Sequence, residues 1–257
     1  MTFPLESLGL IQGFFWILLR VSIILFMLPF FGARGIPTLW KVGVSMVIAI
    51  VITPVVPIPA RFPQTVFEIT LAMIAEVIMG LSLGLGVKML FSAVQLAGQF
   101  MSFQMGFSMA RAIDPNTGVQ STALSQFLYL FTVLIFFAID GHHMLIRALA
   151  RSFSVAPPSG LSFDPGLATV LIRTSARMFL IALKIAAPIM IALFLSNLCL
   201  GIVARTVPQV NILMIGFPLN IGLGLVFFGL TLSQLLPFLI GLTREIGATL
   251  MRMLELM

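Results

Sequence analysis

The chain has 257 residues, of which 60% are hydrophobic and only 9% are charged. Soluble domains carry about a quarter charged residues, so this composition excludes a soluble protein and indicates a polytopic, all-α membrane protein. The net charge of +6 comes from Lys and Arg residues spread along the chain, which predicts contact with membrane lipid and no nucleic-acid binding.

Apolar segments follow one another along the chain, separated by short breaks or by single charges such as Lys88. We count six or seven hydrophobic elements, and the longest apolar runs are 10–31, 42–60, 66–87, 89–110, 115–139, 185–204 and 206–243. An α-helical span needs about 20 apolar residues. No hydrophilic stretch is long enough for a separate catalytic domain, and the common nucleotide, hydrolase and zinc motifs are missing from the sequence. We therefore expect one membrane-embedded domain over 1–257, without enzyme activity, metal or cofactor.

A polar stripe crosses the apolar run 89–110. Gln95, Gln99 and Ser102 stand at i, i+4 and i+7, and Gly106 continues the series at i+11. Residues at these spacings lie on one face of a helix. Two readings stay open, a hydrogen-bonded seam between helices and the wall of a hydrated conduit.

Ser121 and Thr122 predict the start of a helix before Leu124. The apolar run that follows ends in Asp140-Gly141-His142-His143, which indicates a helix terminus near a membrane boundary. Adjacent histidines on a helix point about 100° apart, so we expect no metal site here. Asp140 is expected to cap a helix or to contact solvent.

Arg173, Arg177 and Lys184 form a basic face, because they stand at i, i+4 and i+11 in an apolar helix expected after Asp164-Pro165. Three roles stay open for this face. The cations could pair with Glu68 and Glu76, contact a partner subunit or lipid headgroups, or take part in charge translocation.

The run 206–243 has no charged side chain and is long enough for a hairpin of two helices. Yet it contains prolines and amides, which membrane helices tolerate only where they face protein or water. The residues singled out here are Pro208, Gln209, Asn211 and Pro218.

Three segments resemble the FliR family of flagellar type III export-gate proteins. They are GQFMSFQMGFSMARAIDPNTG at 98–118, FFAIDGHHMLIRALARSF at 136–153 and GIVARTVPQVNILMIGFPLNIGLGL at 201–225. The resemblance implies a subunit of the bacterial inner membrane and flagellar basal body. It implies assembly with FliP and FliQ, and with FlhB and FlhA, into a gate for unfolded flagellar proteins. It also implies helical hairpins in a hetero-oligomer, with residues 1–190 FliP-like and residues 191–257 a FliQ-like hairpin.

The resemblance further implies a plug between Met105 and Thr122. Met105, Phe107 and Met109 would supply soft apolar bulk, and Gly106, Asp114, Pro115 and Gly118 the turn and its hinges. An ordinary reverse turn is the alternative. Pro208, Gln209, Asn211 and Pro218 are then expected to pack against other subunits. Other readings of the whole chain are the equivalent subunit of a virulence injectisome, a small secondary transporter and a purely structural membrane scaffold.

Overall fold

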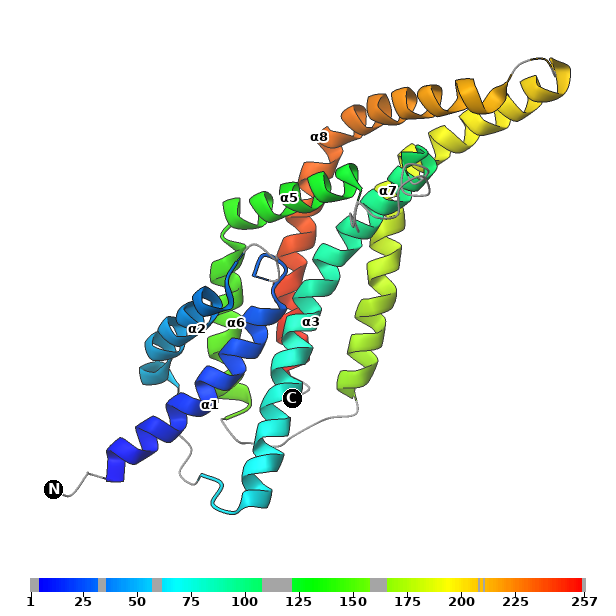
Figure 1. Cartoon of the computed structure of the whole chain (residues 1–257). Helices are drawn as coiled ribbons and strands as arrows, with labels where there is room; N and C mark the ends of the chain where they lie inside the picture. Colours follow the sequence, from blue (N-terminus) through cyan, green and yellow to red (C-terminus); the bar gives the residue numbers. More distant parts are fainter. Residues whose placement is uncertain are drawn as a thin grey trace. The chain divides into compact units, whose positions relative to one another are not determined.

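The computed structural model of the chain describes residues 5–31, 36–56, 62–107, 122–157, 166–207, 209 and 211–255, and the regular elements in these ranges are all helical (Figure 1). The all-α prediction is therefore confirmed. In chain order the elements are α1 (Leu5–Met27), α2 (Thr38–Ile52), the short 3-10 helix η1 (Thr53–Val55), α3 (Val66–Gln104), α5 (Ala123–Ala138), α6 (Gly141–Val155), α7 (Gly166–Thr206) and α8 (Ile212–Glu255).

The helices have the length and composition of membrane spans. Within the described ranges, five helices are long and apolar enough to cross a membrane, or six if α5 and α6 together make one broken span. The prediction of a multi-pass membrane protein is thus confirmed. Helices α3, α7 and α8 have 39, 41 and 44 residues. At 1.5 Å per residue each is about 60 Å long, roughly twice the 30 Å hydrocarbon core of a bilayer.

Two expected breaks are wrong. Helix α3 continues through Lys88, because an exposed Lys can extend its ammonium away from the apolar surface and does not end a helix. The run 206–243 does not fold as a hairpin of its own, since α8 continues through both Pro218 and Pro237. A proline removes one hydrogen bond and kinks a membrane helix without ending it. The turn of the hairpin instead falls between the end of α7 at Thr206 and the start of α8 at Ile212.

The predicted helix start at Thr122 is confirmed. Thr122 is the N-cap of α5, and its hydroxyl accepts a hydrogen bond from the amide of Ser125 at 3.3 Å. Helix α7 likewise begins at Gly166, directly after the expected Asp164-Pro165 pair, although those two residues lie outside the described ranges.

The chain forms two compact units. The first comprises Met1–Met89, Asp140–Ser175 and Thr243–Met257. Within it, α1 packs closely on α3, because a Cβ added at Gly84 would stand 2.5 Å from Cβ of Met27. Buried apolar side chains of α1, α3, α6 and α8 fill its interior, among them Trp16, Val21, Met79, Leu83, Leu149, Phe153, Leu250 and Met253.

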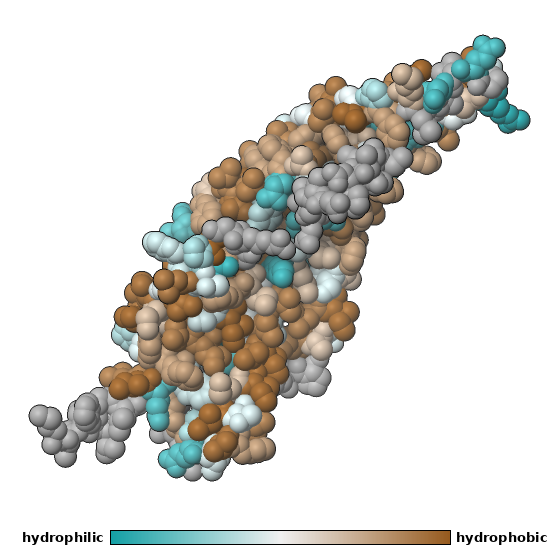
Figure 2. Space-filling view, viewed as in Figure 1, coloured by the Kyte–Doolittle hydropathy of each residue, from teal (hydrophilic) through white to brown (hydrophobic). Residues whose placement is uncertain are grey.

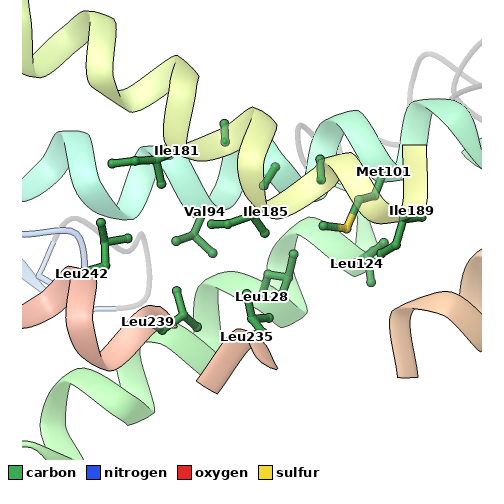
Figure 3. Close-up of a cluster of buried hydrophobic side chains, with 14 of the residues drawn as sticks. Val94, Met101, Leu124, Leu128, Ile181, Ile185, Ile189, Leu235, Leu239 and Leu242 are labelled. Carbon is green, nitrogen blue, oxygen red and sulfur yellow. The ribbon is translucent and has the colours of Figure 1, made fainter. Parts of the chain in front are cut away.

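The second unit comprises Leu90–Ile139 and Ala176–Leu242. Its core brings four helices together, and Figure 3 shows their side chains pointing toward one another. Val94 and Met101 come from α3, Leu124 and Leu128 from α5, Ile181, Ile185 and Ile189 from α7, and Leu235, Leu239 and Leu242 from α8.

Much of the surface is apolar, and Figure 2 shows hydrophobic side chains over most of the visible face. On α2, Leu39 is 81% and Trp40 is 69% exposed, and on α8 Met214 is 78% exposed. Soluble monomers rarely expose contiguous apolar patches of this kind, so these faces fit lipid or another protein chain.

Candidate functional site

The expected plug begins at the carboxyl end of α3. The helix ends at Gln104, and Gly106 adopts a φ of 88°, a conformation that favours glycine and turns the chain out of the helix. Met105 is fully buried in the core of the second unit, against Gly224 of α8, where an added Cβ would overlap its side chain. Phe107 is half-buried against the same core. The structure therefore packs these two apolar residues into the unit at the point where the plug segment leaves α3.

The other expected plug residues, Met109, Asp114, Pro115 and Gly118, lie outside the described residues. The described ends of the segment are Phe107 and Thr122. Both belong to the second unit, and Ser102 Oγ stands 2.7 Å from Thr122 Oγ1. The two ends of the plug segment are thus held near the end of α3.

Part of the polar stripe of α3 lies against α5. Besides the Ser102 contact, the Ser125 hydroxyl donates to the Gln95 backbone carbonyl at 2.9 Å. A Cβ at Gly98 would stand 2.5 Å from Ser125 Cα, so the two helices touch through backbone. Gln95 and Gln99 are half-buried. This arrangement favours the hydrogen-bonded seam over the conduit wall for Ser102.

A cavity of about 150 Å³ lies in the second unit, which is room for several waters. Its lining is largely apolar, with Met101, Ile185 and Phe228 among the residues, and Lys184, Thr231 and Gln234 supply its polar groups. Lys184 of the expected basic face therefore borders this cavity, and it is also exposed to the outside.

Arg173 and Arg177 are also exposed on α7. The acids suggested as their partners have contacts of their own. Glu68 forms a capping box at the start of α3, where its carboxylate accepts from the Thr65 amide at 3.3 Å and the Thr65 hydroxyl accepts from the Glu68 amide at 3.2 Å. Glu76 is fully buried and binds Arg20.

The α7–α8 hairpin of the second unit contains a polar cluster. Asn220 of α8 is 9% exposed, and its amide group donates to Asn197 Oδ1 of α7 at 2.7 Å. The Ser196 hydroxyl of α7 donates to Asn220 Oδ1 at 3.3 Å. Amide pairs of this kind fix the register of two membrane helices. Sequence analysis noticed the amides of α8 but not their partners.

The residues expected to pack against other subunits fall at the turn and on the outside of α8. Gln209, Asn211 and Pro218 are exposed, whereas Pro208 lies outside the described residues. Asn211 also has a local role, because its side-chain oxygen accepts from the Met214 amide at 3.3 Å and caps α8. Hydrophilic side chains gather at the tip of this hairpin (Figure 2).

A buried ion pair in the first unit was missed by the sequence analysis. Arg20 of α1 and Glu76 of α3 are both 0% exposed, and they form two parallel hydrogen bonds of 2.5 and 2.8 Å. The remaining guanidinium nitrogen donates to Ser152 Oγ at 3.2 Å and to the carbonyl of Ala156 at 3.1 Å. The guanidinium also lies 4.3 Å from the centre of the Phe153 ring. Four of its five N–H groups are thus satisfied by three residues from two segments of the chain, α3 and the end of α6.

A signal for this pair exists in the sequence. Arg20 is the one charged residue of the apolar run 10–31, and Glu76 lies in the middle of the run 66–87. An isolated cation and an isolated acid within two membrane helices are each costly alone, which predicts that they pair.

Comparison with known proteins places most of the chain in a family of bacterial export proteins. Residues 11–246 match the family described as bacterial export proteins, family 1. The flagellar biosynthetic protein FliR of Bacillus subtilis is 35% identical over 229 residues, 88% of this chain and 88% of that protein. FliR of Escherichia coli is 30% identical over 241 residues, 94% of this chain and 92% of that protein. FliR of Aquifex aeolicus is 28% identical over 213 residues, 83% and 82% of the two chains.

Proposed function

Because the chain belongs to the bacterial export proteins of family 1, we propose that it is a subunit of the flagellar type III export gate. In this role it helps to conduct unfolded flagellar proteins across the bacterial inner membrane. The observation that carries the proposal is the family match over 11–246, together with similarity to FliR proteins along most of the chain. The multi-pass character of the chain supports the same role. The proposed role is structural and gating, not enzymatic.

We propose FliP and FliQ subunits as neighbours, with FlhB and FlhA as further partners. Large apolar side chains on the α7–α8 hairpin support this. Phe194 is 60%, Met214 is 78% and Leu230 is 67% exposed. We also propose that residues 1–190 are FliP-like and that residues 191–257, the second half of α7 and all of α8, form the FliQ-like part. Gln209, Asn211 and Pro218 would contact neighbouring subunits at and beyond the hairpin turn.

The affinity purification of a tagged copy from gently solubilised native membranes tests this function. Mass spectrometry should recover FliP-like and FliQ-like chains in one large particle, and the identity of the other chains separates a flagellar gate from an injectisome. Recovery of a homogeneous monomer or dimer would reject the gate and favour a small transporter.

For the segment between Met105 and Thr122 we propose the role of a plug. The buried Met105, the turn at Gly106 and the bond between Ser102 and Thr122 would anchor its two ends. The segment between them could then move while α3 and α5 stay in place. Gln95 and Gln99 of α3 would then lie beside the path that the plug closes.

Deletion of residues 107–118 tests the plug. We expect assembly with the partner subunits to be unchanged and the membrane to become leaky to ions, because the closure is removed and its anchors are kept. Ion conductance of reconstituted gates measures this, with the single substitution Ser233→Ala on α8 as a control that should stay closed. Unaltered conductance in a correctly assembled deletion variant would reject the plug.

A further inference from the structure

Asp140, His142 and His143 come together where α6 begins, and all three belong to the first unit. Each offers one ligand atom, and these atoms all lie within 4.8 Å of one another. His143 Nδ1 stands 3.2 Å and His142 Nε2 stands 4.0 Å from the same oxygen, Oδ1 of Asp140. The two imidazole rings are 4.2 Å apart between centres. These are the two histidines of the chain.

The backbone at Asp140 explains how adjacent histidines and a carboxylate meet. Asp140 has φ 57° and ψ 30°, the left-handed conformation, instead of the extended conformation usual for an N-cap. Its carbonyl accepts the first helical bonds, from the amides of His143 and Met144. Its side chain, however, makes no capping hydrogen bond. The carboxylate is turned toward the imidazoles and is largely exposed, so the expected solvent contact is observed and the side-chain capping bond is not.

A left-handed conformation at a residue other than glycine is uncommon and costs free energy. Here it is the one described residue with a positive φ that is not glycine. This conformation places the Asp140 carboxylate beside two imidazole nitrogens. The expectation that adjacent histidines cannot bind the same metal ion assumed that both lie in a regular helix. It did not consider the Asp140 carboxylate, which precedes the helix.

We propose that Asp140, His142 and His143 form a binding site for a divalent late transition-metal ion such as Zn²⁺. Imidazole and carboxylate groups are ligands that Zn²⁺ accepts, at about 2.0–2.2 Å. Ligands at this distance in a tetrahedral site stand roughly 3.4 Å from one another. The carboxylate oxygen and His143 Nδ1 stand close to this spacing at 3.2 Å, whereas His142 Nε2, at 4.0 Å from the same oxygen, must move closer to share the ion.

The site is open to ions from outside the protein. The side chains of His142, His143 and Asp140 are 35%, 57% and 71% exposed. Three protein ligands leave one tetrahedral position, which water fills. The carboxylate offsets the positive end of α6, which on its own would repel a cation. A bound ion would link the Asp140 side chain to the His142 and His143 side chains in the first turn of α6.

Zinc titration of the full-length chain tests the site. The chain is purified in detergent with a tag that contains no histidine, in a Cys199→Ser background that removes the one thiol. We expect one Zn²⁺ per chain by calorimetry, and Co²⁺ should bind in its place with a visible absorption band. Zn²⁺ should also protect the two histidines from diethylpyrocarbonate, whose product is counted by absorbance.

Variants identify the ligands. Asp140→Asn and His143→Gln should each weaken Zn²⁺ binding at least about tenfold, and the pair His142→Gln and His143→Gln should abolish it. Asn tolerates the left-handed conformation, so Asp140→Asn keeps the fold, which its elution volume in size exclusion verifies. Glu255→Gln, which removes an exposed carboxylate at the end of α8, is the matched control and should bind as the parent does.

Two outcomes overturn the proposal. The first is that the double histidine variant binds Zn²⁺ as tightly as the parent chain, which would place the metal elsewhere. The second is that Asp140→Asn binds no more weakly than Glu255→Gln, which would remove the carboxylate from the ligand set. Neither outcome bears on the export function, which the purification of the assembled gate tests separately.

Discussion

Arg20 connects three helices of the first unit. Its guanidinium is buried at 0% exposure and binds α3 through Glu76 and the end of α6 through Ser152 and Ala156. A charge in this position is stable only while its hydrogen-bond partners are present, because transfer of an unpaired charge from water costs several kcal/mol. One side chain therefore holds three helices together.

We expect Glu76→Gln to destabilise the chain by about 3–5 kcal/mol, because it leaves a buried guanidinium without its counter-charge. The double variant Arg20→Met with Glu76→Met should recover most of this loss, since similar apolar side chains can fill the space without a charge. Thermal unfolding in detergent measures both. Arg252→Met removes an exposed cation and should change stability by less than about 0.5 kcal/mol. A double variant no more stable than Glu76→Gln would contradict a coupled pair.

Gly98 is the residue that sets the distance between α3 and α5. An added Cβ would stand 2.5 Å from Cα and 3.1 Å from the amide nitrogen of Ser125, and backbone atoms cannot move aside as a side chain can. Gly98→Ala should destabilise the second unit by about 1–3 kcal/mol. Gly229→Ala on α8 is the matched control. Its added Cβ meets nothing within 4 Å, and Ala favours a helix more than Gly does. Equal thermal stability of the two variants would contradict the close approach.

Sequence analysis predicted some residue roles better than others. Thr122 was identified as a helix start because an N-cap is a local property, read from the few residues around it. The Arg20–Glu76 pair joins residues 56 positions apart, and no local pattern specifies which distant groups meet. Asp140, His142 and His143 were named from the sequence, but how close their side chains come was not predicted, for another reason. The geometry of this cluster depends on one left-handed residue, which helical periodicity does not describe.

At the scale of elements, the long helices dominate the chain. Apolar runs predicted that α3, α7 and α8 exist, but their ends were harder to place. Lys88 interrupts a hydrophobic run without interrupting a helix, and neither Pro218 nor Pro237 ends α8. Hydropathy indicates whether a segment lies in an apolar environment or in water. The end of a helix depends instead on backbone hydrogen bonds. The break between α7 and α8 falls at 207–211, whose sequence combines Pro, Gln and Asn, residue types that favour turns.

The register of α7 against α8 depends on Asn220. We expect Asn220→Leu to lower the stability of the hairpin by about 0.6–1.7 kcal/mol, because Asn197 and Ser196 lose a shared partner. Ser233→Ala is the control, since its hydroxyl bonds to the carbonyl of Leu230 on its own helix. Disulfide trapping of cysteine pairs placed across the hairpin should show mixed registers in Asn220→Leu. A single register in that variant would show that apolar packing alone aligns the two helices.

Over its described residues, the molecule exposes more apolar side chain than soluble monomers usually do. For Phe194, Leu195 and Leu198 of α7, between 52% and 60% of the residue surface is exposed. If partner subunits cover this helix, reagents should reach it in the isolated chain and not in the assembled gate. Composition predicted that these surfaces avoid water, but composition does not distinguish lipid from protein as the cover, because both are apolar.

Labelling of Cys199 can show whether partner subunits cover this face of α7. Cys199 is the one cysteine of the chain, and it is exposed on α7. We expect a maleimide to label Cys199 in the isolated chain in mild detergent and to label it at least about tenfold more slowly in the assembled gate, since neighbouring chains would exclude the reagent. A cysteine at Glu255, in a Cys199→Ser background, should react at similar rates in both. Equal rates at Cys199 would place this face of α7 outside the subunit contacts.

The buried pair also has a consequence for biosynthesis. Glu76 leaves the ribosome 56 residues after Arg20, and Ser152 follows Arg20 by 132 residues. At about 5–20 residues per second, the nascent chain holds Arg20 for roughly 3–11 s before its carboxylate partner is made. During that interval α1 carries a cation without its carboxylate partner, which raises the free-energy cost of placing this helix in the bilayer. The ion pair that joins the first helix to α3 can therefore form only after the start of α3 has been made, and the bonds to Ser152 and Ala156 only after α6.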